Sequence, residues 1–134
     1  MAGTEDTIAK GIAAGRVLFG LGCLVAPRTV LGPTAARAEG QMIWMARAFG
    51  VRDIVLGTGT LLALGQAEAT GAEGADEAAT RWVELSAAAD SLDIANAVVF
   101  HGELDRGGVA ATLALAVPAA VGGWWAARTR RATA

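Results

Sequence analysis

The sequence predicts an all-α fold: an integral membrane protein whose single domain, residues 1–134, is a four-helix antiparallel bundle. Hydrophobic residues make up 54% of the chain and charged residues only 18%, whereas about a quarter of the residues of a soluble domain are charged. Four apolar segments each approach the roughly 20 residues that a helix needs to cross a bilayer. No stretch alternates polar residues with β-branched or aromatic ones, so no strand is expected.

The first apolar segment covers about residues 8–26 and ends at Pro27, which lacks the backbone N–H that a helix interior needs. Acidic residues precede this segment and Arg16 interrupts it, a pattern that fits a cleavable signal peptide poorly. We therefore expect this helix to remain in the mature protein. The following stretch, 27–41, is punctuated by proline and glycine and is expected to be a loop.

The second segment, about 42–64, is apolar except for Arg47, Arg52 and Asp53. A central Arg or Asp costs about 2.5 to 3.5 kcal/mol on an insertion scale, and each Leu, Ile, Val or Phe returns only about 0.3 to 0.6 kcal/mol. The apolar residues of this segment do not offset its three charges, so we expect it to insert only with partners. Residues 66–80 are rich in Ala, Glu and Gly and indicate a solvated acidic linker.

The third segment, about 82–101, is the least hydrophobic and carries three acidic residues. A hairpin at 101–108 leads to the fourth segment, about 107–127, which holds no charged residue and is the strongest candidate for a membrane span. A soluble four-helix protein is the rival interpretation. It is disfavoured because a soluble bundle of this size could not cover a helix that is apolar on all faces.

Basic residues favour an orientation in a bacterial plasma membrane with both termini cytoplasmic, under the positive-inside rule. Five of them then lie inside and three outside: Lys10, Arg81, Arg128, Arg130 and Arg131 against Arg28, Arg37 and Arg106. Tryptophans stand near segment ends, where indole rings favour the level of the lipid headgroups. These are Trp44, Trp82, Trp124 and Trp125. The alternative is that the indole rings fill the protein core.

The acidic residues of the third segment can form ion pairs with the basic residues of the first two segments. Charged side chains in hydrocarbon face the interior of a bundle and pair there. At 100° per residue, Asp90, Asp93 and Asn96 share one face of the third helix with Ser86. This face is therefore expected to point toward the guanidinium groups.

The three charges of the second helix spread around its axis, so they cannot all face one neighbour. We expect Arg52 and Asp53 to form the deep pair. Arg47 then either extends to the membrane interface or is turned inward by a bend at Gly50. The predicted polar core, in its ligand-binding or structural role, consists of Arg16, Arg47, Arg52, Asp53, Asp90, Asp93 and Asn96.

Small residues four positions apart predict two close helix contacts, because they let backbones approach each other. Gly11 and Gly15 form one such pair in the first helix. Ala46 and Gly50 form the other in the second helix.

Short motifs spread over nearly the whole chain resemble those of a known family. They are Arg16 in a Gly-rich first helix, Pro27-Arg28 before Leu31-Gly32, the string Arg47–Gly50–Arg52-Asp53–Gly57, and Asp90 with Asp93. This pattern resembles the small four-helix bacterial membrane proteins of the DoxX-like group. That group includes subunits associated with thiosulfate:quinone oxidoreduction, and distant relatives among eukaryotic sterol-binding proteins. The resemblance implies a four-helix membrane fold with a polar cluster at Arg52, Asp53, Asp90 and Asp93.

The predicted cluster of charged residues is the feature of the sequence that points to a function. One interpretation is structural: ion pairs and hydrogen bonds that fix the register of the helices. A second is a pocket in which Arg52 or Arg16 binds the phosphate or carbonyl group of an amphiphile (a lipid, a quinone or an isoprenoid), while aspartates hold the guanidinium groups. A third is proton-coupled transport by an oligomer, because crowded carboxylates favour protonation.

Other chemistry is not expected. Cys23 is alone and cannot form an intramolecular disulfide, and His101 has no second histidine for a metal site. A formal net charge of -2 argues against a nucleic-acid partner. We therefore expect a binding or accessory protein without catalytic residues, metal or cofactor. It contacts membrane lipids and works as a homo-oligomer or as a subunit of a larger membrane complex.

Overall fold

Helices account for nearly all of the chain that the computed structural model describes, which is residues 3–32, 40–72, 74–103 and 106–133. Their order is α1 (Thr4–Val25), α2 (Pro27–Leu31), α3 (Gly40–Thr70), α4 (Ala75–Val99), the 3₁₀ helix η2 (His101–Glu103) and α5 (Arg106–Thr133). No strand occurs within these described ranges. The all-helical prediction is confirmed.

Charged residues at the helix ends match the helix dipoles. Glu5 and Asp6 lie in the first turn of α1, Asp76 lies in the first turn of α4, and Arg130 and Arg131 lie in the last turn of α5. Acidic groups are stabilised near a helix N-terminus and basic groups near a C-terminus, each by about 0.3–1 kcal/mol.

Two connections differ from the prediction. Residues 66–80 were expected to be a solvated linker, but α3 continues to Thr70 and α4 begins at Ala75. The actual turn contains Gly71 and Gly74, both with positive φ angles of 54° and 83°, which glycine adopts without a steric penalty. In the expected loop 27–41, Pro27 starts the short helix α2, because proline is tolerated in a first helical turn. Residues 33–39 of that loop, Arg37 among them, lie outside the described ranges.

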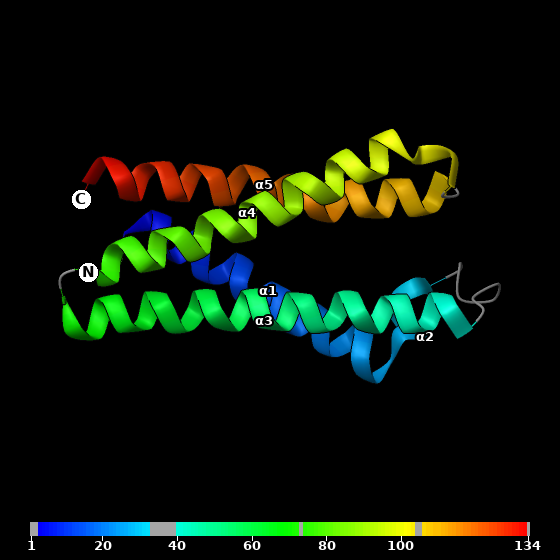
Figure 1. Cartoon of the computed structure of the whole chain (residues 1–134), viewed down its shortest axis with the longest axis horizontal. Coiled ribbons are helices and arrows are strands. Elements are labelled where there is room, and N and C mark those ends of the chain that lie inside the picture. The colour runs from blue at the N-terminus through cyan, green and yellow to red at the C-terminus, as the bar shows by residue number, and fades with distance from the viewer. Residues whose placement is uncertain (1–2, 33–39, 73, 104–105, 134) are drawn as a thin grey trace.

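Successive long helices run in alternate directions, and both chain ends lie at the same end of the molecule (Figure 1). Helix α1 packs most extensively against α3, and α4 against α5. Contacts of α3 with α4 and of α1 with α5 join these two pairs. Helices α1 and α4 are therefore diagonal to each other across the interior.

Buried positions recur at alternating steps of four and three residues. In α1 they are Ala9, Ala13, Arg16, Gly20 and Cys23, and in α3 they are Ala46, Gly50, Asp53, Gly57, Thr60, Leu64 and Ala67. A mean repeat of 3.5 residues keeps one stripe of each helix against its partner over a long distance. Nearly all of these residues are small, so α1 and α3 lie close together along their shared stripe.

Glycines bring the backbones of α1 and α3 into direct contact. A Cβ on Gly50 would lie 2.7 Å from the Gly20 carbonyl oxygen, and a Cβ on Gly57 would lie 2.5 Å from the Ala13 carbonyl oxygen. The expected contact at Gly50 is thus present. The expected contact of Gly11 and Gly15 is wrong, because both face open space. They lie outside the stripe that contains Ala13 and Gly20.

Large apolar side chains cover much of the outside of the molecule. Leu18, Val25, Leu62 and Val121 are each at least 66% exposed. By length and composition, α1, α3 and α5 could each cross a membrane. Helix α4 is not among these three helices, and it carries Glu84, Asp90 and Asp93.

The tryptophans fall into two environments. Trp44 is 67% exposed, as an interfacial side chain would be. Trp82 packs against Gly59, where an added Cβ would lie 2.4 Å from the indole ring. Trp124 donates a hydrogen bond from Nε1 to Ser91 Oγ over 3.1 Å. Helix packing therefore uses Trp82, as the alternative interpretation of these residues expects.

The glycine contacts predict opposite effects for two matched substitutions. Gly57→Ala should destabilise the protein by about 1–3 kcal/mol, because the new methyl group overlaps the α1 backbone. Gly15→Ala, in open space, should be neutral or stabilising by up to about 1 kcal/mol through helix propensity. Unfolding followed by circular dichroism in mild detergent measures both. Equal stabilities for the two variants would contradict this packing.

Candidate functional site

Charged side chains occupy the interior stripe near the middle of three helices. Arg16 of α1, Asp53 of α3 and Asp90 of α4 are only 6%, 7% and 5% exposed. Each falls near the middle of the apolar segment predicted for its helix. These charges are removed from water in the part of the molecule where an unpaired charge is most costly.

Arg16 joins the three helices through its two terminal nitrogens. Its Nη1 donates to Asp53 Oδ1 over 2.7 Å. Its Nη2 donates to the Ser86 carbonyl oxygen over 2.9 Å and also pairs with Asp90 Oδ1. Because α1 and α4 are diagonal, only a long side chain can make this link, and the planar guanidinium presents donors to two acceptors at once.

A second guanidinium extends the arrangement toward the surface. Arg52 donates from Nη1 and Nη2 to the two carboxylate oxygens of Asp93 over 2.9 and 2.6 Å. Its Nη2 also lies 3.3 Å from Asp53 Oδ1, so Asp53 connects the two arginines. Such bidentate pairs are the strongest form of charge-assisted hydrogen bond. We call the five residues Arg16, Arg52, Asp53, Asp90 and Asp93 the Arg/Asp network.

The deep pair differs from the expected one. The Arg52 side chain is 35% exposed and that of Asp93 25%, whereas the side chains of Arg16 and Asp53 are 6% and 10% exposed. Arg16 is thus the deep partner of Asp53. Arg52 precedes Asp53 by one residue, which is a rotation of 100° around the helix, and it therefore turns away from the interior stripe. The guanidinium lies 5.2 Å from the centre of the Phe49 ring.

Two residues of the predicted polar core are not part of the network. Arg47 is exposed and follows the buried Ala46, and Asn96 is exposed and precedes the buried Ala97. One residue along a helix is a rotation of 100°, which carries both side chains to the outside. Of the two alternatives for Arg47, its exposure therefore agrees with the one in which the side chain extends outward.

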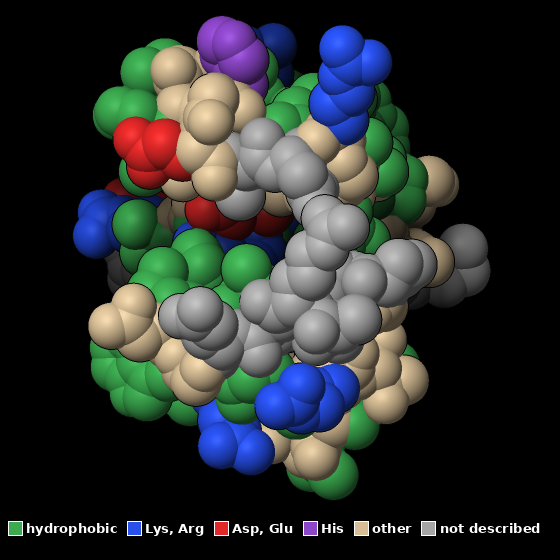
Figure 2. Space-filling model, turned by 90° about the vertical axis from the view of Figure 1, so that its right-hand side faces the viewer, with side chains coloured by type: hydrophobic (Ala, Val, Ile, Leu, Met, Phe, Trp, Pro, Cys, Tyr) green, Lys and Arg blue, Asp and Glu red, His purple; other side chains and the backbone are tan. Residues whose placement is uncertain are grey.

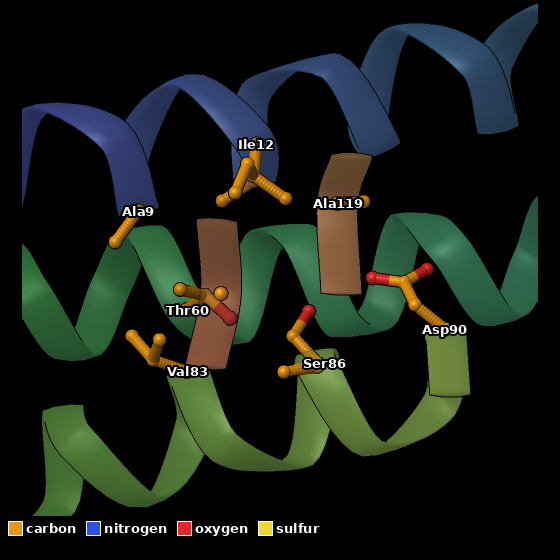
Figure 3. A pocket seen from close by; sticks show the side chains of 10 residues that line it. Ala9, Ile12, Thr60, Val83, Ser86, Asp90 and Ala119 are labelled. Atoms are coloured by element: carbon orange, nitrogen blue, oxygen red, sulfur yellow. The ribbon is translucent and has the colours of Figure 1, made fainter. Parts of the chain in front are cut away.

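A small cavity adjoins the network (Figure 3). Its volume is about 10 Å³, and Thr60, Ser86 and Asp90 are its polar lining residues, the rest being Ala, Gly, Ile and Val. This is about the volume that one water molecule needs. Two buried oxygens of the lining residues, Ser86 Oγ and Asp90 Oδ2, have no hydrogen-bond partner. Ser86 lies on the helix face predicted from the sequence, whereas Thr60 was not predicted, since a lone threonine in an apolar stripe carries no distinguishing pattern.

Acidic and basic side chains are also visible from the end of the molecule that bears α2 and η2. Some of them, near the centre of this view, lie deeper than the hydrophobic side chains beside them (Figure 2). The side-chain exposure of Arg52 and Asp93 shows that this part of the network is partly accessible from outside the protein.

A separate ionic cluster ties the opposite end together. Arg130 pairs with Asp6 of α1, lies 3.2 Å from Asp76 Oδ1 and donates from Nε to Thr80 Oγ1 over 3.1 Å. Arg131 holds both carboxylate oxygens of Glu84 at 2.6 and 2.8 Å. The sequence-based prediction considered these arginines only for the orientation of the chain. The signals that could have predicted this ionic cluster are the acidic first turns of α1 and α4 and the basic last turn of α5.

The described ranges hold no group of three His, Cys, Asp or Glu side chains that could bind a metal ion. Cys23 is buried against the α1–α3 contact, and His101 is exposed with its Nδ1 3.0 Å from the Val98 carbonyl oxygen. Comparison with known proteins adds no assignment: no family model, curated protein or solved structure matches the chain.

Removal of Arg16 should be much more harmful than removal of Arg47. Arg16→Met leaves buried carboxylates without their guanidinium and should cost about 3–5 kcal/mol. Arg47→Met, at an exposed position, should change stability by less than about 0.5 kcal/mol. The second substitution Asp53→Asn should restore part of the stability lost in Arg16→Met. Denaturation in detergent tests all three, and an Arg16→Met variant as stable as Arg47→Met would refute the structural importance of the network.

Proposed function

We propose that this chain is an integral protein of a bacterial plasma membrane, with four antiparallel spans and both termini in the cytoplasm. The apolar character of α1, α3 and α5 supports three of the spans. The fourth, α4, depends on its acidic residues being neutralised. Asp90 and Asp93 contact arginines of α1 and α3, and Glu84 contacts Arg131 near the end of α5.

The outer face of α4 supports its placement in lipid. Leu85, Leu92 and Val99 are 58%, 70% and 66% exposed. A helix with charges inside and large apolar side chains outside has the reverse of the arrangement in a soluble protein. The same arrangement is the one expected of ionisable residues within a membrane bundle.

Single cysteines can test the four-span topology and its orientation. In a Cys23→Ala background, Gly102→Cys in η2 should react with a membrane-impermeant maleimide added to intact cells. Ala72→Cys, in the turn between α3 and α4, should react only after permeabilisation. The two sites flank α4, so labelling of both from one side would show that α4 does not cross the membrane. Reversed labelling would overturn the orientation alone.

We further propose that the protein is a non-enzymatic accessory or binding component, working as a homo-oligomer or as a subunit of a larger membrane complex. One observation carries this proposal: both Nη nitrogens of Arg16 and of Arg52 already contact protein acceptors. The cavity beside them has the volume of about one water molecule. The network is therefore suited to holding helices together, and the apolar outer surface is left for contacts with lipids and other proteins. Membership of the DoxX-like group is part of this proposal.

An amphiphile-binding function is the second candidate. The 35% exposure of the Arg52 side chain favours it. A polar headgroup of a lipid, a quinone or an isoprenoid would lie near Arg52, with its apolar part along exposed hydrophobic side chains of the protein. Transport or redox coupling would then be the role of the larger assembly.

Mass spectrometry of the purified protein distinguishes the two candidates. An accessory protein should appear as an oligomer or with a second membrane protein in native spectra, and Arg52→Ala should leave its co-purifying lipids and quinones unchanged. An amphiphile-binding protein should carry one lipid or quinone species in near-stoichiometric amount, lost in Arg52→Ala and retained in Arg47→Ala. Because Arg47 is exposed and outside the network, it controls for a general loss of positive charge.

A further inference from the structure

We propose that the Arg/Asp network binds one proton, carried on Asp90 Oδ2 and connected to Ser86 Oγ by a water molecule in the adjoining cavity. The inference rests on the proposed membrane location of the network. The structural role of the network does not require this proton site. Three independent features of the described residues lead to it: the balance of charges, the unpartnered oxygens and the size of the cavity.

The charges of the network do not balance. Its two guanidinium groups face three carboxyl groups, so full ionisation would leave one negative charge in the interior. Asp90 meets Arg16 from α1 and the charges of Asp53 and Asp93 from α3 and its own helix. The only residues of α5 that line the cavity are Ala119 and Gly123. No further cation among these lining residues compensates the excess, and an uncompensated buried charge is removed by protonation.

The hydrogen bonds indicate which carboxyl group is protonated. Both oxygens of Asp93 accept from Arg52, and Asp53 accepts from both arginines, as ionised carboxylates do. Asp90 uses Oδ1 for Arg16, while its Oδ2 is buried without a partner. A hydroxyl group at Oδ2 is neutral and needs one acceptor, and no protein donor holds Oδ2 in its ionised form.

The cavity supplies that acceptor. Its volume of about 10 Å³ suits a single water molecule, and both orphan oxygens, Asp90 Oδ2 and Ser86 Oγ, belong to residues that line it. Figure 3 shows the carboxyl group of Asp90, the hydroxyl of Ser86 and the side chain of Thr60 around the same space. The water accepts the proton of Oδ2–H and donates to Ser86 Oγ. Protonation therefore takes one H⁺ from bulk water, forms one O–H bond and satisfies both orphan oxygens.

This arrangement leaves the network neutral. Arg16 is then balanced by Asp53 and Arg52 by Asp93, at the distances of 2.7 and 2.6 Å already described. Asp90 contributes a hydrogen bond to Arg16 without contributing a charge. The same carboxyl group is the one member of the network placed to exchange its proton through the cavity water.

Infrared spectroscopy of the detergent-purified full chain tests the proposal. At neutral pH the wild type should show the C=O stretching band of a protonated carboxylic acid, shifted on transfer to D₂O. The band should be lost in Asp90→Asn and retained in Glu84→Gln, which replaces a carboxyl group that pairs with Arg131 outside the network. Asp90→Asn should also keep the wild-type unfolding midpoint, since the amide mimics the neutral acid, whereas Asp93→Asn should lower it by unpairing Arg52.

Two results would overturn the proposal: absence of the band in folded wild type, or its persistence in Asp90→Asn. A small cation could supply the missing positive charge instead. In that case the wild-type midpoint would rise in sodium chloride relative to choline chloride at equal ionic strength, and Asp90→Asn would abolish the rise. Failure of the membrane topology would appear separately in the cysteine labelling, because the infrared band reports on the carboxyl group alone.

Discussion

The structure depends on the contacts that Arg16 makes with two carboxyl groups away from water. Arg16 links α1 to Asp53 of α3 and to Asp90 and the Ser86 carbonyl of α4. Without these contacts, α4 would bring an isolated acidic group into the interior of an otherwise apolar molecule. The cost of a buried unpaired charge is several kcal/mol, comparable with a large share of the stability of a small domain. The position of α4 therefore depends on the contacts of its acidic residues with arginines as well as on its packing against α5.

Small residues make this neutralisation geometrically possible. The α1 and α3 backbones touch at Gly20, Gly50 and Gly57, which places the start of the Arg16 side chain directly against α3. The guanidinium then has enough length left to cross the interior to the diagonal helix. On the other side, Gly123 of α5 lies against Ala87, where an added Cβ would be 2.9 Å from the alanine methyl group. Close packing by glycine and alanine is the usual means of helix association where the surroundings are as apolar as the side chains.

The two ends of the molecule have different characters. At the end that holds the chain termini, Arg130, Arg131 and Lys10 pair with acidic residues of three helices, and the interior beside them is filled by Leu64, Val83 and alanines. Toward the other end the Arg52–Asp93 pair is more exposed and the first buried residue of α5 is Ala116.

The sequence by itself determined the helical class, the approximate segments and most of the polar centre. Long apolar runs interrupted by few charges admit helices and little else, and five of the seven expected polar-core residues meet in the network. Tertiary structure alone decided which arginine lies deepest. Arg16 and Arg52 occupy similar apolar runs, and they differ only in whether the residue belongs to the stripe that faces the neighbouring helix. It also decided that Gly20 and Gly57, rather than Gly11 and Gly15, form the close contact, and that Arg47 and Asn96 lie outside. These alternatives differ by a rotation of 100° per residue around the helix axis. The neighbouring helices determine which face of a helix turns inward, and the sequence of one segment does not contain that information.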